Sequence, residues 1–165
     1  MTPDEIAAAA AEVRKAGASI VHYHVRNADG SPCHDASVYS DTLHKIRGTC
    51  DILVHPTSGQ VTIEGNEARL AHIVAAEDDP VLKPDFAPID MGSTDVDRYD
   101  AAAGRYGSDN LAYINTIGTL QFFARRMCEL GVKPALVTWN IPFARTLEAF
   151  SNWASWTSLC IFCCR

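Results

Sequence analysis

The chain has 165 residues, of which 47% are apolar and 21% are charged, and its formal net charge is −6. This length and composition predict one globular domain with a substantial hydrophobic core. The negative net charge, with no local Lys/Arg cluster to offset it, excludes a general nucleic-acid binder. No apolar run reaches the ~18 residues that a membrane span needs. The acidic start Thr2-Pro3-Asp4-Glu5 is also unlike a signal peptide. We therefore expect a cytoplasmic protein that binds neither nucleic acid nor membranes and whose six cysteines are reduced thiols.

Predicted helices and strands alternate along the chain with short connections. Thr2 and Glu5 form a capping box at the start of the first helix, and Gly17 follows its end. The polar segment between Arg98 and Arg105 is interpreted as a loop with a short helix. The predicted helices span 6–15, 36–47, 67–76, 116–130 and 142–150, and the predicted strands span 19–25, 51–56, 86–91, 111–115 and 135–139. This alternation indicates parallel strands joined by right-handed crossovers.

The apolar strand 19–25 carries two histidines, His22 and His24. Alternate residues of a strand point to the same face, so the two Cα atoms should lie ~6.6 Å apart on one face. Imidazole is a preferred ligand of zinc and other transition metals, so the pair predicts a divalent metal site with zinc as the expected ion. Arg26 continues the same face. The alternative is a pair of hydrogen-bonded core histidines, although each would then need a buried partner.

Polar residues gather where the predicted strands end. His55 is followed by the loop Thr57-Ser58-Gly59-Gln60, whose backbone N–H groups could bind an anion, although an ordinary turn fits equally well. Ser93-Thr94 follows the next strand. A TIM barrel builds its active site from the C-terminal ends of its strands, but a full barrel needs eight strands and ~250 residues. The fold class expected is therefore α/β, a partial TIM (β/α)8 barrel of about five parallel strands with covering helices, over residues 2–150.

The histidine strand also carries a resemblance to a known family. The segment 16–26 reads AGASIVHYHVR and is followed by Asp29-Gly30 and His34-Asp35. It resembles the β-keto acid cleavage enzymes, the family of the 3-keto-5-aminohexanoate cleavage enzyme, whose strand reads G-A-x-x-V-H-x-H-V-R before a D-G turn and a short H-D. The likeness continues in order over residues 2–150, at Pro56-Thr57-Ser58-Gly59, Met91-Gly92-Ser93, Asn115-Thr116 and Gly131-Val132-Lys133-Pro134.

The resemblance implies a metal-dependent acyltransferase of amino acid catabolism. Members of the family are TIM barrels, usually homotetramers, that bind a divalent metal, commonly zinc. They condense a β-keto acid with acetyl-CoA and cleave the product, giving acetoacetate and a new acyl-CoA. Carried over by motif, His22 and His24 are the metal ligands. The residues expected around the substrate are Thr57, Ser58, Gly59, Ser93, Thr94 and Arg26.

Other family elements have no counterpart in this sequence. The resemblance places the first barrel strand before Thr2, and a glutamate ligand with an aspartate and an arginine beyond residue 150. The catalytic acid and base are thus expected outside this chain, and residues 151–165 form a C-terminal tail without family likeness or helical period. Two alternatives stay open. One is a catalytically inactive fragment with at most weak metal binding or an assembly role, and the other is a metal-dependent lyase that needs no CoA thioester.

Overall fold

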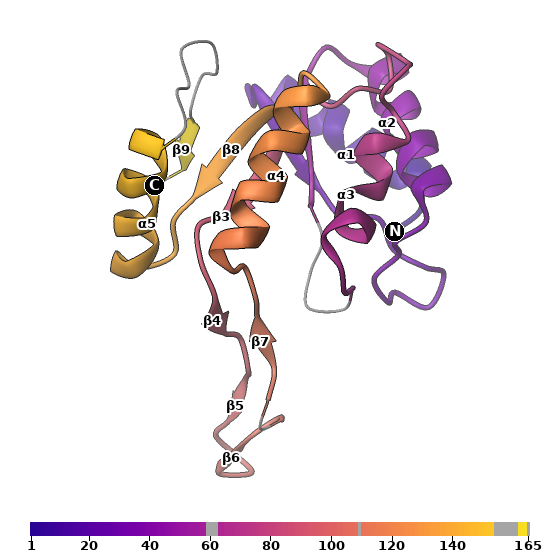
Figure 1. Cartoon of the computed structure of the whole chain (residues 1–165). Helices are drawn as coiled ribbons and strands as arrows, with labels where there is room; N and C mark the ends of the chain where they lie inside the picture. Colours follow the sequence, from indigo (N-terminus) through magenta and orange to yellow (C-terminus); the bar gives the residue numbers. More distant parts are fainter. Residues whose placement is uncertain (59–62, 109, 154–161, 165) are drawn as a thin grey trace.

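The structure is a computed structural model that describes residues 1–58, 63–108, 110–153 and 162–164. The helices are α1 (Pro3–Lys15), α2 (Ala36–Thr49), α3 (Asn66–Val74), α4 (Ile117–Glu129) and α5 (Ile141–Trp153). The main strands are β1 (Ile20–Tyr23), β2 (Leu53–Pro56), β3 (Phe86–Asp90), β8 (Lys133–Val137) and β9 (Phe162–Cys164). Figure 1 shows these elements with the helices packed beside the strands. In the part of the chain that the structure describes, no helix is long and apolar enough to cross a bilayer.

Local sequence signals fix the helix starts as expected. The Thr2 hydroxyl accepts the N–H of Glu5, and the Glu5 carboxylate accepts the N–H of Thr2 at 2.6 Å, which confirms the capping box. Asp35 caps α2 by accepting the N–H of Ser37 at 2.8 Å. These short-range hydrogen bonds depend only on neighbouring residues, so they could be inferred without the tertiary structure.

The parallel strands form two sheets, one of two strands and one of three. β1 pairs with β2 with His22 opposite His55, and β3 pairs with β8, which in turn pairs with β9. β2 and β3 are joined by Asp85, whose N–H donates to Val54 O at 3.1 Å and whose carboxylate accepts the N–H of Val54 at 2.8 Å. The same carboxylate receives Arg47 of α2 at 2.8 Å, so one aspartate ties a helix to two strands.

The expected strand at 111–115 does not join the parallel sheet, and this prediction was wrong. β7 (Ala112–Tyr113) instead pairs antiparallel with β4 (Thr94–Asp95), and β3 pairs directly with β8. The expected short helix near Arg98 is also wrong, since β5 (Tyr99–Asp100) and β6 (Arg105–Tyr106) form an antiparallel pair. Figure 1 shows β4 to β7 extending away from the other elements. These residues bury little apolar surface, so packing does not hold them in the parallel sheet. Their backbone N–H and C=O groups are instead satisfied by antiparallel pairing of β4 with β7 and of β5 with β6.

The hydrophobic core consists of two clusters, one packed against each of the two parallel sheets. One cluster joins α1, α2, β1 and β2 around Ile46 and Val54, and the other joins α3, α4, β3 and β8 around Ile89 and Phe123. Ile20 and Leu53, which are opposite each other, keep about 40% of their surface exposed (40% and 41%), so one face of the β1–β2 ladder is open.

Candidate metal and substrate site

Three histidines meet at the β1–β2 ladder. His22 lies on β1, His55 lies opposite it on β2, and His24 follows the end of β1. The Nε2 atoms of His22 and His24 are 3.0 Å apart, and their rings cross at 86° with centroids 4.9 Å apart. The His22 ring also lies 4.8 Å from the His55 ring. The pairing of His22 with His24 on one face is thus confirmed, whereas the contact with His55 comes from the strand register.

The contacts of His22 define its tautomer. Its Nδ1 lies 2.8 Å from the backbone oxygen of His55 and 3.0 Å from His55 Nδ1. A carbonyl oxygen only accepts hydrogen bonds, so Nδ1 of His22 carries the hydrogen and Nε2 presents a lone pair toward His24. A ring N–H donated to a backbone carbonyl is the usual way in which proteins orient a metal-binding histidine.

All three imidazoles are biased toward the neutral form. Burial lowers the pKa of His22 below its ordinary value. Burial, together with the charges of His22 and Arg26, lowers the pKa of His24 to about 4. Burial and the charge of His22 lower the pKa of His55 to about 4. At neutral pH the lone pairs are therefore available, as metal binding requires.

The geometry of the pair suits a zinc-like ion. Two nitrogens held tetrahedrally at ~2.0–2.1 Å from zinc lie roughly 3.3 Å apart. The observed 3.0 Å between the Nε2 atoms of His22 and His24 is close to that separation. Among the described residues, no group of three or more His, Cys, Asp or Glu side chains has an arrangement that could hold a metal. His22 and His24 thus have a separation compatible with two nitrogen ligands, and their role as the metal ligands stays a prediction.

Asp90, at the end of β3, is a site residue that the sequence interpretation missed. Tyr113 donates its hydroxyl to the Asp90 carboxylate at 2.6 Å, and Asn115 donates its amide to the backbone oxygen of Asp90 at 2.7 Å. Burial raises the pKa of Asp90, while Tyr113, Trp139 and the charge of His22 act in the opposite direction. Asp90 and His22 therefore each influence the pKa of the other. Its position at the end of a predicted strand was the signal available.

The loop after β2 is held firmly against its neighbours. Thr57 and Ser58 are buried, with 6% and 4% of their surface exposed. The Ser58 hydroxyl donates to the backbone oxygen of Pro88 in β3, and the Thr57 N–H donates to Tyr23 O at 3.2 Å. Gly59, the third residue expected to bind the substrate carboxylate in this loop, lies outside the described residues. The Ser58 hydroxyl is therefore directed at a neighbouring strand.

The remaining expected substrate residues are spread around the histidines. Ser93 is exposed and its hydroxyl accepts the N–H of Asn115 at 2.9 Å, which fixes the base of the β4–β7 ribbon. Thr94 is half-buried within β4. Arg26 is exposed and forms an isolated bridge with Pro32, and its charge acts on His24. Arg26 thus acts on His24 through its charge, and Ser93 lies beside the Asp90–Asn115 contact.

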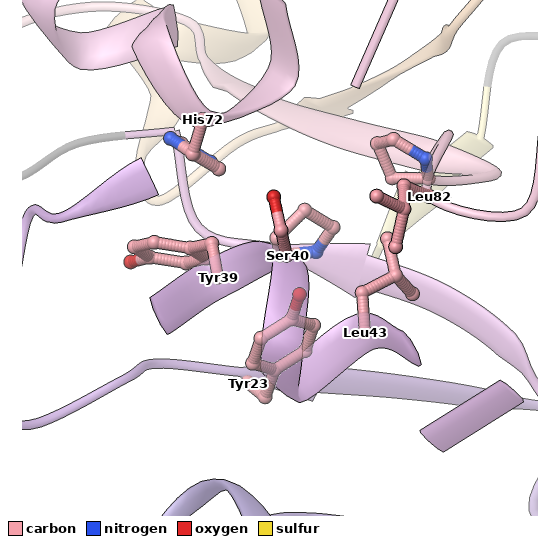
Figure 2. A pocket seen from close by; sticks show the side chains of 8 residues that line it. Tyr23, Tyr39, Ser40, Leu43, His72 and Leu82 are labelled. Atoms are coloured by element: carbon pink, nitrogen blue, oxygen red, sulfur yellow. The ribbon is translucent and has the colours of Figure 1, made fainter. Parts of the chain in front are cut away.

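A fourth histidine, His72, contacts the backbone of the loop that follows β2. His72 of α3 stacks on Tyr39 of α2, with centroids 4.1 Å apart and rings inclined by 29°. A hydrogen bond to the Thr57 backbone favours its protonation, but burial dominates and lowers its pKa to about 4. Its Nε2 is buried without a hydrogen-bond partner among the described residues. Figure 2 shows His72 and Tyr39 at a small cavity of about 10 Å³, also lined by Tyr23 and Ser40, which is about the space of one water molecule.

Comparison with known proteins identifies the family. The family model for "beta-keto acid cleavage enzyme" matches residues 1–154. The chain belongs to this family. It is 32% identical over 136 residues to a 3-keto-5-aminohexanoate cleavage enzyme of Fusobacterium nucleatum, covering 82% of this chain and 43% of that protein. The family resemblance drawn from the histidine strand is thereby confirmed.

Further relatives extend the likeness. The chain is 26% identical over 171 residues to a 3-dehydrocarnitine:acetyl-CoA trimethylamine transferase of Rhizobium meliloti, covering 89% of this chain and 52% of that protein. The solved structure of ObcA in a ternary complex with a C4-CoA adduct and oxalate shares the fold with a TM-score of 0.71 at 15% identity, covering 92% of this chain and 33% of that one. The chain thus spans about half, or less, of the length of the curated relatives that it matches.

Proposed function

We propose that this chain provides the metal-binding part of a β-keto acid cleavage site built on a partial TIM barrel over residues 2–150. The reaction would combine a β-keto acid, R–CO–CH₂–COO⁻, with acetyl-CoA to give acetoacetate and the new thioester R–CO–CoA. The observation that carries the proposal is the 3.0 Å pair of Nε2 atoms on His22 and His24, with the tautomer of His22 fixed by the backbone of β2. Family membership and the acetyl-CoA-dependent activity named for the Rhizobium meliloti relative support the substrate classes.

In this proposal His22 and His24 hold a divalent ion, which we expect to be zinc. When bound, the ion supplies Lewis-acid polarisation of the keto oxygen. His22 is oriented by the backbone of His55, so its Nε2 lone pair already faces His24. His24 would turn the other tautomer of its ring to the ion, because its Nε2 donates to His22 in this structure. The carboxylate of Asp90, held by Tyr113, adds negative charge close to His22 and favours a cation at the pair.

The substrate carboxylate is proposed to lie between the loop after β2 and the base of the ribbon. The family resemblance assigns Thr57, Ser58 and Gly59 to one side of this carboxylate and Ser93 and Thr94 to the other, with the Arg26 cation at the rim beside His24. The Ser58 hydroxyl is donated to Pro88 O, so Ser58 would take part only if that hydrogen bond is given up. Hydroxyl and backbone donors suit a carboxylate, and a cation nearby strengthens its binding. The buried state of Thr57 and Ser58 supports a fixed arrangement of this loop.

The setting of the reaction is also part of the proposal. We place the protein in the cytoplasm and in a homotetramer, as the family resemblance implies. The division into a barrel part over residues 2–150 and a C-terminal tail over residues 151–165 was inferred from the sequence and stays a prediction.

Zinc binding by the purified chain tests the metal part of the proposal. A competition titration with a chromophoric chelator should give one zinc per chain. His24→Ala should weaken zinc binding by at least about tenfold, because one of two nitrogen ligands is lost. His44→Ala is the matched control, since His44 is an exposed histidine of α2. Equal zinc affinity in both variants would refute the assignment of the ligand pair.

Acetoacetate release tests the reaction itself. The zinc-loaded chain is incubated with acetyl-CoA and a panel of β-keto acids, and acetoacetate is measured against the His24→Ala variant. Release that requires both acetyl-CoA and His24 supports the cleavage reaction. Zinc binding without release identifies the inactive fragment instead, and turnover without acetyl-CoA identifies a metal-dependent lyase.

A further inference from the structure

Arg69, in the first turn of α3, is a buried cation without an ion-pair partner among the described residues. Only 7% of its surface is exposed. Its terminal nitrogens donate to Ile114 O and to the Tyr113 hydroxyl, both at 3.3 Å, and its Nε is buried without a partner. The Phe123 ring lies 4.7 Å from the guanidinium carbon. A buried guanidinium is costly unless an anion balances its charge. The Asp90 carboxylate acts on this charge from the far side of the Tyr113 hydroxyl, while the Nε group is left without a hydrogen-bond partner among the described residues.

A cavity of about 430 Å³ lies beside this guanidinium. Its wall includes Arg69, the start of α3 at Gly65 and Asn66, and the Thr119 hydroxyl. Gly65 occupies the N-cap position and gives α3 no side-chain cap. The first N–H groups of the helix are therefore free of a capping side chain and carry the positive end of the helix dipole. Two independent sources of positive potential thus face one cavity.

We propose that this cavity binds an oxyanion, and that the bound group is a phosphate of the CoA thioester. Helix N-termini and arginine are the two elements that proteins most often use for phosphate, through backbone N–H groups and a planar pair of donors. The volume exceeds that needed for a carboxylate alone. The anion site rests on Arg69 and the cavity, whereas its assignment to CoA rests on the proposed function.

Tyr113 connects this site to the histidine cluster. Its hydroxyl donates to Asp90 at 2.6 Å and accepts from Arg69 at 3.3 Å, so one side chain contacts both the carboxylate near His22 and the buried cation. A phosphate bound at Arg69 would therefore hold a CoA thioester close to the histidine cluster, with its flexible pantetheine arm left to carry the thioester to the reacting groups.

Glu64 gives the proposal a sensitive test because it also lines the cavity. This exposed carboxylate repels an anion, so Glu64→Gln should tighten anion binding by about twofold to fivefold. Glu148→Gln, the same change on exposed α5, is the matched control and should leave binding unchanged. Neither change touches the core.

The experiment is an isothermal titration of the purified chain with inorganic pyrophosphate at fixed ionic strength. Saturable binding that Glu64→Gln tightens and Glu148→Gln leaves alone is expected. Arg69→Met should weaken binding at least about tenfold, since a charged donor is removed. If Arg69→Met does not fold, the comparison of Glu64→Gln with Glu148→Gln decides the result. Absence of saturable binding, or equal affinity in both glutamate variants, overturns the site.

Two further measurements distinguish a phosphate site from a carboxylate site, and the anion site from the cleavage reaction. Acetoacetate that binds with the same variant pattern in place of pyrophosphate overturns the assignment to phosphate and identifies a carboxylate site. The His22→Ala variant should bind pyrophosphate as the unsubstituted chain does. If the unsubstituted chain binds pyrophosphate but releases no acetoacetate, the result counts against the cleavage reaction and not against the anion site.

Discussion

Lowering the pH from 7 to 5 is expected to destabilise the fold through His72. This half-buried side chain of α3 stacks on Tyr39 of α2, and its pKa is about 4 in the folded protein, against an ordinary value of 6.5. The unfolded chain therefore takes up a proton at a pH where the folded chain does not. Stability is fully present above the unfolded pKa of 6.5 and is lost as the pH falls toward 4.

The magnitude follows from the two pKa values. Between pH 7 and pH 5 the difference in proton uptake costs about 2 kcal/mol, with one pKa unit equivalent to ~1.4 kcal/mol. Domains of this size have total stabilities of about 5–15 kcal/mol, so the loss is readily measurable. The pKa values of His24 and His55 are lowered as well, and this makes stability depend more steeply on pH. A variant is therefore needed to isolate the contribution of His72.

Urea unfolding at pH 7, 6 and 5, followed by circular dichroism, measures the effect. His72→Asn removes the titrating ring but keeps an N–H donor for the Thr57 backbone. The variant should be less stable at pH 7 because it leaves a small cavity, yet its pH dependence should be flatter by about 2 kcal/mol. His44→Asn, at an exposed position, should keep the original dependence. Parallel curves for the unsubstituted chain and His72→Asn would refute the reasoning.

Two other substitutions test the packing that positions the site. A Cβ at Gly92 would lie 2.6 Å from the ring of buried Phe143, so Gly92→Ala should cost about 1–3 kcal/mol. Gly48→Ala, in α2 with open space around it, should instead stabilise by about 0.5–1 kcal/mol, and similar effects of both changes in thermal unfolding would contradict the close contact. Asp85→Ala removes the half-buried partner of Arg47 and an acceptor for the β2 backbone, and should cost about 2–4 kcal/mol. A loss below ~0.5 kcal/mol in urea unfolding would show that Asp85 does not tie β2 to β3.

The errors of sequence interpretation share one physical cause. The segment 111–115 has the composition of a strand, and it does form one, but its partner is β4 and not the parallel sheet. Amino-acid composition indicates that a segment prefers an extended backbone. Which strand it pairs with depends on the path of the chain between β4 and β7, which composition does not determine. Arg69 was missed for a similar reason. Its helix could be recognised, but its burial beside Phe123 and Ile114 depends on residues at least 45 positions away along the chain.

The sequence by itself determined the features that depend on near neighbours. The capping box at Thr2 and the shared face of His22 and His24 follow from residues a few positions apart and from the two-residue period of a strand. The tertiary structure decided which distant groups complete the site. The β1–β2 register brought His55 against His22, and the ribbon brought Tyr113 to Asp90 across 23 residues. Those contacts arise from strand pairing and burial of the whole chain, and no local pattern encodes them.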